Sequence, residues 1–349
     1  MTLSRQLVAK LRSLPSAAVP AGVREAAKLH LLDAIGVGLA AAATGAGAPY
    51  LKAAPALNGT GGPATIFGSG DGFAAATAAL ANGGMIHGLE YDDTHTASIV
   101  HGSSVLAASA LAAAESAGAN GDALLTAYIK AWEVLIRTGL AAPGKFQAQG
   151  FQITSVAGVL AAALVAAELF RLDEARNVDA VGIALSQASG VFEFLTNGST
   201  VKSLHAGWAA HGGIIAATLA GAGLTGPETS FEGQFGLFRC FANDAEAIDR
   251  FAAAIASLGS TWHLPQAAFK FYPCCTDTYV DDVFGGARRP PTREAVLTKF
   301  RANAALTGNV DDVRMLEATV LSIEHRPIVD VTRLLRSYRS GNAARSTAA

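Results

Sequence analysis

Segments of small apolar residues with helical periodicity run through most of this chain, and they constrain its fold more than any other feature. Such segments occupy residues 23–43, 121–142, 173–190 and 244–259. In the second of them, one helix face carries Leu124, Leu125, Tyr128, Ile129, Trp132 and Ile136. Alternating strand patterns are nearly absent, and "PATIFGSG" at 63–70 is the only early candidate. The chain is therefore predicted to be mainly all-α.

Two helix boundaries follow from the positions of glycine and serine. Residues 71–91 predict a helix that Gly83 and Gly84 interrupt. The next apolar segment predicts a helix with Ser103 or Ser104 as its N-cap, because a serine side chain readily accepts a hydrogen bond from a free backbone N–H.

The composition disfavours two classes of partner. Of the 349 residues, 51% are hydrophobic and only 15% are charged, which is ample material for a large core. The net charge is −2 and there is no basic tail, so binding to nucleic acid is not expected. The apolar stretches 153–167 and 206–226 are predicted to be buried helices, because a membrane span needs roughly 20 strongly apolar residues.

The N-terminal residues and the cysteine usage predict a cytoplasmic protein. Residues 1–20 alternate charged and apolar residues and lack the continuous apolar region of a signal peptide. The three cysteines form no CxxC pair, so neither a disulfide framework nor a zinc ribbon is indicated. A reducing compartment fits this usage best.

Polar chemistry concentrates in "HGLEYDDTHTASIVHGSS", residues 87–104. Its histidines and carboxylates are His87, Glu90, Asp92, Asp93, His95 and His101. They are compatible with a metal site, although the spacing matches neither HExxH nor an EF-hand loop. A loop with capping and turn residues, or an acid/base site, are the alternatives. The stretch alone does not decide between the three.

A second candidate segment is "NGSTVKSLHAGWAAHGG", residues 197–213. Lys202 and His205 are three positions apart, so on a helix they share one face. A helix that begins here also points backbone N–H groups at an anion. The alternative is a solvated lysine that precedes a buried helix.

A third candidate is Lys270, which lies between Phe269 and Phe271 just before a proline. Apolar neighbours predict a lysine with a lowered pKa or one that binds a carboxylate. The alternative is a surface lysine on a turn. Cys274 and Cys275 follow, and no motif supports a nucleophile there, so they are interpreted as buried small residues.

Taken in order, these segments resemble the MmgE/PrpD family. The resemblance rests on "NGGMIHGLEYDDTH", "HGSSVLAASALAAAE", "GFQITSVAGVLAAAL", "KSLHAGWAAHGGIIAATLAGAGLTG" and "KFYPCC", and it covers roughly residues 5–283. The family includes 2-methylcitrate dehydratase, cis-aconitate decarboxylase and iminodisuccinate epimerase. The resemblance implies a large helical domain with a smaller α/β lid, a homodimer, and no metal or organic cofactor. It also implies small di- or tricarboxylate substrates and proton movement beside a carboxylate.

The resemblance assigns roles to individual residues. The implied catalytic residues are His101 as general acid/base, Lys202 and Lys270 for anion binding or proton transfer, and Asp93. The implied substrate-binding residues are Glu90, Asp92, Thr94, Gln152 and His205. Asp92 and Asp93 are expected to orient His101 or a lysine rather than to touch the substrate. No metal ligands are implied.

The chain departs from the family pattern in two ways. Gln152 stands where characterised members have a histidine, Gly102 replaces the proline of an "HPS" loop, and Tyr279 replaces a histidine after the cysteines. The flanks of the α/β lid also meet directly. The predicted organisation is a helical catalytic-type domain at 1–284, a junction at 285–292 where the lid is missing, C-terminal helices at 293–340 that pack back on it, and a frayed tail at 341–349.

The sequence thus predicts a hydro-lyase similar to 2-methylcitrate dehydratase. Gln152 cannot shuttle protons, which disfavours epimerisation or decarboxylation of the kinds the family is known for. Those reactions remain an alternative. A catalytically impaired helical dimer that binds carboxylates or a protein partner is another, and a metal hydrolase is a third.

Overall fold

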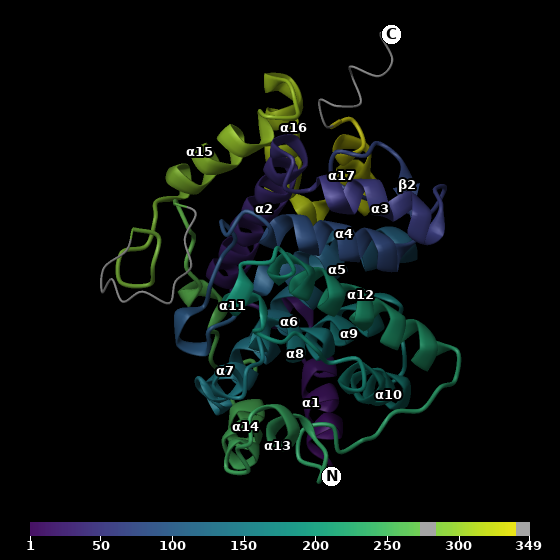
Figure 1. The fold of residues 1–349 in the computed structure, drawn as a ribbon, viewed down its shortest axis with the longest axis vertical. Coiled ribbons are helices and arrows are strands. Elements are labelled where there is room, and N and C mark those ends of the chain that lie inside the picture. Colours follow the sequence, from purple (N-terminus) through teal and green to yellow (C-terminus); the bar gives the residue numbers. More distant parts are fainter. Residues whose placement is uncertain (273–283, 340–349) are drawn as a thin grey trace.

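The computed structural model describes residues 1–272 and 284–339 and confirms a mainly all-α fold (Figure 1). Its centre consists of α2 (Ala21–Thr44), α4 (Ala75–His87), α5 (Gly102–Ala117), α6 (Gly121–Ala141), α9 (Gly158–Leu169) and α12 (Lys202–Gly221). In the described ranges, the strands β1 (Ala64–Thr65) and β2 (Gly72–Phe73) pair antiparallel, and β1 lies within the predicted strand candidate. Cys274, Cys275 and Tyr279 lie outside the described residues.

Shorter helices surround this centre. At one end, near the N-terminus, lie α1 (Leu3–Arg12), α7 (Lys145–Ala148), α10 (Glu174–Leu185), α13 (Leu237–Phe241) and α14 (Ala247–Ala256) (Figure 1). The remaining helices of the body are α3 (Ala48–Asn58), α8 (Ile153–Val156) and α11 (Phe194–Asn197). At the opposite end lie α15 (Arg293–Ala304), α16 (Val310–Leu321) and α17 (Ile328–Leu335).

The prediction that Gly83 and Gly84 interrupt a helix is wrong, because both lie inside the continuous α4. The reason is tertiary packing. A Cβ at Gly83 would lie 2.8 Å from the Cα of Gly207 in α12, and one at Gly84 would lie 2.3 Å from the ring of Tyr50. The glycines therefore permit a close approach of neighbouring elements at a cost in helix propensity.

The predicted serine N-cap of α5 is also wrong. The helix begins two to three residues earlier, with His101 at the N-cap and without a side-chain cap. The backbone N–H of Ser103 instead donates to Asp93 Oδ1 at 3.1 Å. A carboxylate from the preceding loop therefore caps this helix and faces the positive end of its dipole.

The C-terminal helices contact the main body. The helices α15 and α16 pack on α2, and α17 packs on α5 and β1. Leu316, Val320 and Ile323 are buried in the common core. A buried ion pair adds to this contact, because Lys299 Nζ of α15 lies 2.8 Å from Asp33 Oδ1 of α2.

Among the described helices, only α2 has the length and hydropathy to cross a membrane. Its most apolar 18-residue window is 83% buried inside the protein. The high hydropathy of this helix is therefore explained by its central place in the core (Figure 1).

Candidate active site

The three candidate segments meet at one buried cluster of polar side chains. The loop after α4 pairs with the segment before Lys270, since the N–H of Thr94 donates to the carbonyl of Ala268 at 3.0 Å and the reverse bond is 2.7 Å. Lys202 and His205 come from the first turn of α12, and Gln152 is the N-cap residue of α8. The fold thus brings together residues that are far apart in the sequence.

Asp92 lies at the centre of this cluster and is fully buried. His87 Nδ1 lies 2.8 Å from Asp92 Oδ2, and Lys270 Nζ lies 3.7 Å from Asp92 Oδ1. Burial opposes ionisation of this carboxyl, but His87, His101 and Lys270 together hold its pKa well below its usual range. Asp92 is therefore a carboxylate at neutral pH.

Lys270 is 4% exposed, and its ammonium group makes no hydrogen bond with the described residues. Its counter-charge is Asp92, whose Oδ1 also accepts no hydrogen bond within the described ranges. Buried polar groups normally form hydrogen bonds, and exceptions are often functional. The Lys270 ammonium therefore retains donor capacity for a ligand carboxylate.

A directional chain of hydrogen bonds leads from α12 to Asp92. His205 Nδ1 lies 2.7 Å from Gln152 Oε1, and Gln152 Nε2 lies 3.2 Å from His87 Nε2. Because an amide oxygen only accepts and an amide nitrogen only donates, His205 donates to Gln152 and Gln152 donates to His87. His87 in turn donates through Nδ1 to Asp92. Gln152 thus orients two histidines at once.

His101 is held as a neutral base. Its Nδ1 lies 3.1 Å from the backbone carbonyl of Asp93 and 2.9 Å from Thr94 Oγ1. The carbonyl can only accept, so Nδ1 carries the proton and Nε2 carries the lone pair. Burial, with a further contribution from the Lys270 charge, lowers the pKa of His101 well below its usual value although Asp92 opposes this. Its ring centroid lies 5.0 Å from that of His87.

Two residues lie at the edge of the cluster. Lys202 Nζ and Glu90 Oε2 are 2.5 Å apart, with side-chain exposures of 16% and 33%. Glu90 has a φ of 53°, a left-handed conformation that is uncommon for residues other than glycine. Burial, with smaller contributions from His87 and Lys202, lowers the pKa of His205 to about 4.

Asp93 has a different environment from the other predicted residues. Its carboxylate contacts His30 and Ser103, and only its backbone carbonyl contacts the ring of His101. Sequence reasoning missed His30 because it is one polar residue in an apolar helical segment. The sequence indicated His87 only as a metal ligand. Its position at the end of α4, directly before the polar loop, could have indicated that it belongs to the site.

The donor atoms of His87, Asp92 and His101 lie within 4.8 Å of one another, as ligands of a metal ion would. Two observations favour proton chemistry instead. The carboxylate already accepts from His87 Nδ1, and the Lys270 ammonium lies 3.7 Å away. A divalent cation at this place would be repelled by that buried positive charge.

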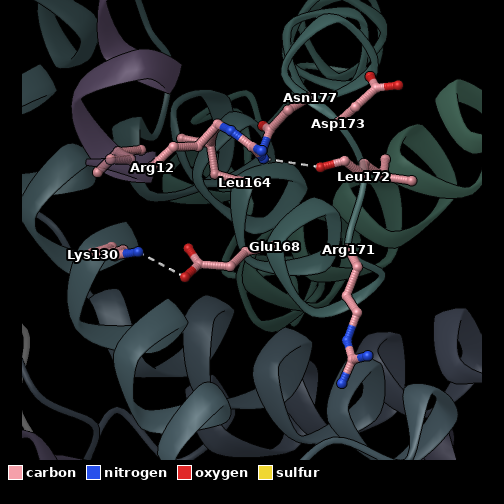
Figure 2. A pocket seen from close by; sticks show the side chains of 9 residues that line it. Arg12, Lys130, Leu164, Glu168, Arg171, Leu172, Asp173 and Asn177 are labelled. Carbon is pink, nitrogen blue, oxygen red and sulfur yellow. Dashed lines mark hydrogen bonds and ion pairs between the residues drawn. The ribbon is translucent and has the colours of Figure 1, made fainter. Parts of the chain in front are cut away.

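A pocket of about 500 Å³ lies elsewhere (Figure 2). Its lining includes none of the cluster residues. Its charges tie helices together, because Lys130 of α6 pairs with Glu168 of α9 at 2.7 Å, and Arg12 of α1 donates to the carbonyl of Leu172 at 3.1 Å. A smaller pocket of about 280 Å³ borders His30 and Phe269.

Comparison with known proteins agrees with this arrangement. The family model of the MmgE/PrpD N-terminal domain matches residues 5–248. The chain belongs to the MmgE/PrpD family. Cis-aconitate decarboxylase from Aspergillus terreus is 30% identical over 270 residues, which is 74% of this chain and 54% of that protein. The human cis-aconitate decarboxylase is 33% identical over 228 residues, 63% of this chain and 46% of that protein.

The chain spans about half the length of the curated relatives it matches. The similarity to the family, predicted from the motifs, is confirmed. In this MmgE/PrpD protein, Asp92 contacts Lys270 and His87, and Gln152 joins His87 to His205. This cluster is the part of the molecule from which its function is best inferred.

Proposed function

We propose that this MmgE/PrpD protein is a lyase for a small di- or tricarboxylate, and that His101 removes a proton from a carbon next to a carboxylate. The observation that carries the proposal is that His101 and the buried cation Lys270 both lie beside the Asp92 carboxylate, with ligand atoms of His101 and Asp92 within 4.8 Å and Lys270 Nζ 3.7 Å from Asp92 Oδ1. A base and a cation in one cluster are the two groups that such a proton abstraction needs.

In this proposal the cations hold the substrate. Lys270 receives one carboxylate, which completes the hydrogen bonds that it does not make with the described residues. Lys202 and the N-terminus of α12 receive another. Asp92 supplies the counter-charge of Lys270, and the low exposure of the cluster strengthens each of these electrostatic interactions.

We assign dehydration as the reaction. The C–H electrons form the new double bond, the proton goes to His101 Nε2, and the C–O bond breaks. The departing hydroxide takes a proton from Lys270 and leaves as water. A histidine with a lowered pKa suits the first step, since it is unprotonated at neutral pH. Dehydration is also the reaction that the sequence predicts, that of a hydro-lyase similar to 2-methylcitrate dehydratase.

Decarboxylation is the second candidate, and the names of the two relatives favour it. In that reaction a C–C bond breaks and the carbon must receive a proton. Gln152 holds the place of a histidine seen in characterised members and cannot donate a proton in this way. Lys270 would have to supply it.

The remaining features of the proposal concern organisation. Residues 1–284 form the catalytic-type unit, 285–292 the junction at which family members carry a lid, and 293–340 the returning helices. We also propose that the protein is a cytoplasmic homodimer that works without a cofactor and takes small carboxylates as its partners. In this proposal it binds neither nucleic acid nor membrane. An open site without a lid would be slower, because water weakens electrostatic stabilisation.

The test is to incubate the purified chain with 2-methylcitrate, cis-aconitate and related acids, and to follow double-bond absorbance and CO₂ release. The proposal expects turnover of at least one acid and its loss in H101N and K270M. As a matched control, H211N changes a histidine that bonds the carbonyl of Ala76 and should retain activity. Thermal stabilisation by these acids without turnover would instead support a carboxylate-binding protein. Equal turnover in all variants would contradict the proposal.

A further inference from the structure

We propose that His30 is a positioning residue, which fixes the tautomer of His101 through Asp93. His30 lies in the middle of α2 and is 1% exposed. Its ring stacks on Phe269 with centroids 4.0 Å apart and an interplanar angle of 8°. Its Nδ1 lies 2.8 Å from Asp93 Oδ2, so the ring is fixed on two sides and presents one donor to the carboxylate.

Asp93 is anchored by more than this one bond. The backbone N–H of Ser103 donates to Asp93 Oδ1, and the Ser103 hydroxyl donates to Oδ2. The same hydroxyl lies 2.5 Å from the Tyr128 hydroxyl, which extends the network into α6. His30 of α2 therefore completes, with Ser103 of α5, the set of donors around one buried carboxylate, and Tyr128 of α6 bonds to the Ser103 hydroxyl.

The backbone of Asp93 connects this anchor to the proposed base. Its own carbonyl oxygen lies 3.1 Å from His101 Nδ1, and the next residue contributes Thr94 Oγ1 at 2.9 Å. Holding the side chain of residue 93 holds this carbonyl as well. Because a carbonyl only accepts, its place beside Nδ1 keeps the proton on Nδ1 and leaves Nε2 as the base.

A purely structural role for His30 makes a different prediction. If it only filled space or paired Asp93, its loss would lower stability and leave the proton on Nδ1 of His101. If it positions the Asp93 carbonyl, its loss would let the ring populate the tautomer with the proton on Nε2, which cannot act as the base. The tautomer itself is therefore the deciding measurement, and the effect on turnover rests on the proposed function.

The experiment labels the histidines of the full chain with ¹⁵N and records the ring nitrogens of His101 by NMR, with H101N to assign the signals. The ¹⁵N shift separates a protonated from an unprotonated ring nitrogen. Four variants are compared with the wild type. They are H30L, which removes the donor, H30N, which places an amide donor where Nδ1 stands, H30Q, which moves that donor away, and H211L as control.

The control is matched because His211 also stacks on an aromatic ring, that of Trp208, and also forms a bond through Nδ1. We expect the Nδ1–H tautomer in the wild type, H30N and H211L, and a substantial Nε2–H population in H30L and H30Q. If H30L does not fold, H30Q replaces it. A wild type with the proton on Nε2, or folded H30L and H30Q with unchanged His101 signals, would overturn the inference.

Kinetics then separate this inference from the proposed function. For the acid that the chain turns over, kcat should fall on the order of tenfold in H30L and H30Q, with little change in KM and recovery in H30N. The pH dependence of kcat should change as well, because His101 Nδ1–H no longer donates to an Asp93 carbonyl that is held in one position. If no acid is turned over, the proposed function fails while the tautomer measurement still decides the role of His30.

Discussion

Two groups of buried charges in this protein have similar burial and very different hydrogen bonding. On α6, Glu133 and Arg137 pair with each other, and all their polar ends are engaged. Glu133 Oε1 accepts from the backbone N–H groups of His263 and Leu264, both at 2.8 Å, and Arg137 donates to the carbonyls of Ala254 and Thr261 at 3.1 and 2.7 Å. In the cluster, Lys270 Nζ and Asp92 Oδ1 make no hydrogen bond with described residues.

This difference indicates that the Glu133–Arg137 pair contributes to stability and that the Asp92–Lys270 pair is available for function. A buried pair whose hydrogen bonds are complete ties elements together, here α6 to the segment that precedes Lys270. A buried pair that is incomplete costs free energy in folding and retains the capacity to bind a ligand. Removal of the Arg137 charge should therefore mainly lower the stability of the protein, and removal of the Lys270 charge should mainly lower its catalytic activity.

The largest expected effect is on catalysis. H101N and K270M should lower kcat/KM by about 10²- to 10⁴-fold, because they remove the base and the cation of the proposed reaction. K270M should lower the midpoint of thermal unfolding less than R137M does, since the Lys270 ammonium makes no hydrogen bond with the described residues and Asp92 keeps its bond with His87. A large loss of stability in K270M would contradict the comparison, and R137M provides the matched variant.

The next effect is on folding. R137M should lower the free energy of unfolding by roughly 3 to 5 kcal/mol, because it leaves Glu133 buried without its partner. The measurement is denaturant unfolding followed by circular dichroism. The variant E133Q/R137M, which removes both charges, should recover part of the loss. Equal stability of R137M and the wild type would show that this pair does not tie α6 to the following segment.

Stability should also depend on pH in a defined window. Burial lowers the pKa of His95 and of His205 to about 4, with the charges of His263 and of His87 and Lys202 adding to it. The unfolded chain, with pKa values near 6.5, then binds more protons between these limits. The free energy of unfolding should therefore fall as pH is lowered from about 6.5 to 4, by on the order of 1 to 3 kcal/mol for each group.

The variant H205N sharpens this test, because it removes one of the two titrations and should reduce the slope of stability against pH in this window. The H211N variant is the control, and its slope should equal that of the wild type. A slope of opposite sign, with stability rising as the solution becomes more acidic, would contradict the assignment of His95 and His205 as neutral buried groups.

The smallest effect is expected at the edge of the cluster. E90Q should change the free energy of unfolding by less than about 1 kcal/mol, because its ion pair with Lys202 is partly exposed. Its effect should appear in KM, since Glu90 competes with a substrate carboxylate for Lys202. A lower KM with an unchanged unfolding midpoint is the expected result, and unfolding of E90Q at moderate temperature would contradict it.

Much of this arrangement was predictable from local patterns. The helical periodicity of segments such as 121–142 predicts the mainly all-α fold, because amphipathic and small-residue patterns act over a few turns. The motifs also indicated Lys202, Gln152 and Lys270 as members of one site. They did not predict that α4 is uninterrupted. Gly83 permits the close approach of Gly207 on another helix, and a local pattern contains no information about that contact.

The sequence by itself determined the helices, the family and the set of polar side chains. The tertiary structure decided which of these side chains bond to one another, and so which histidine is the proposed base. His30 and Asp93 are 63 positions apart, Gln152 and His87 are 65 apart, and Lys202 and Glu90 are 112 apart. No local pattern encodes such pairs, because hydrogen bonds of this kind form only after the packing of α2, α4, α5 and α12 brings the donors and acceptors into contact.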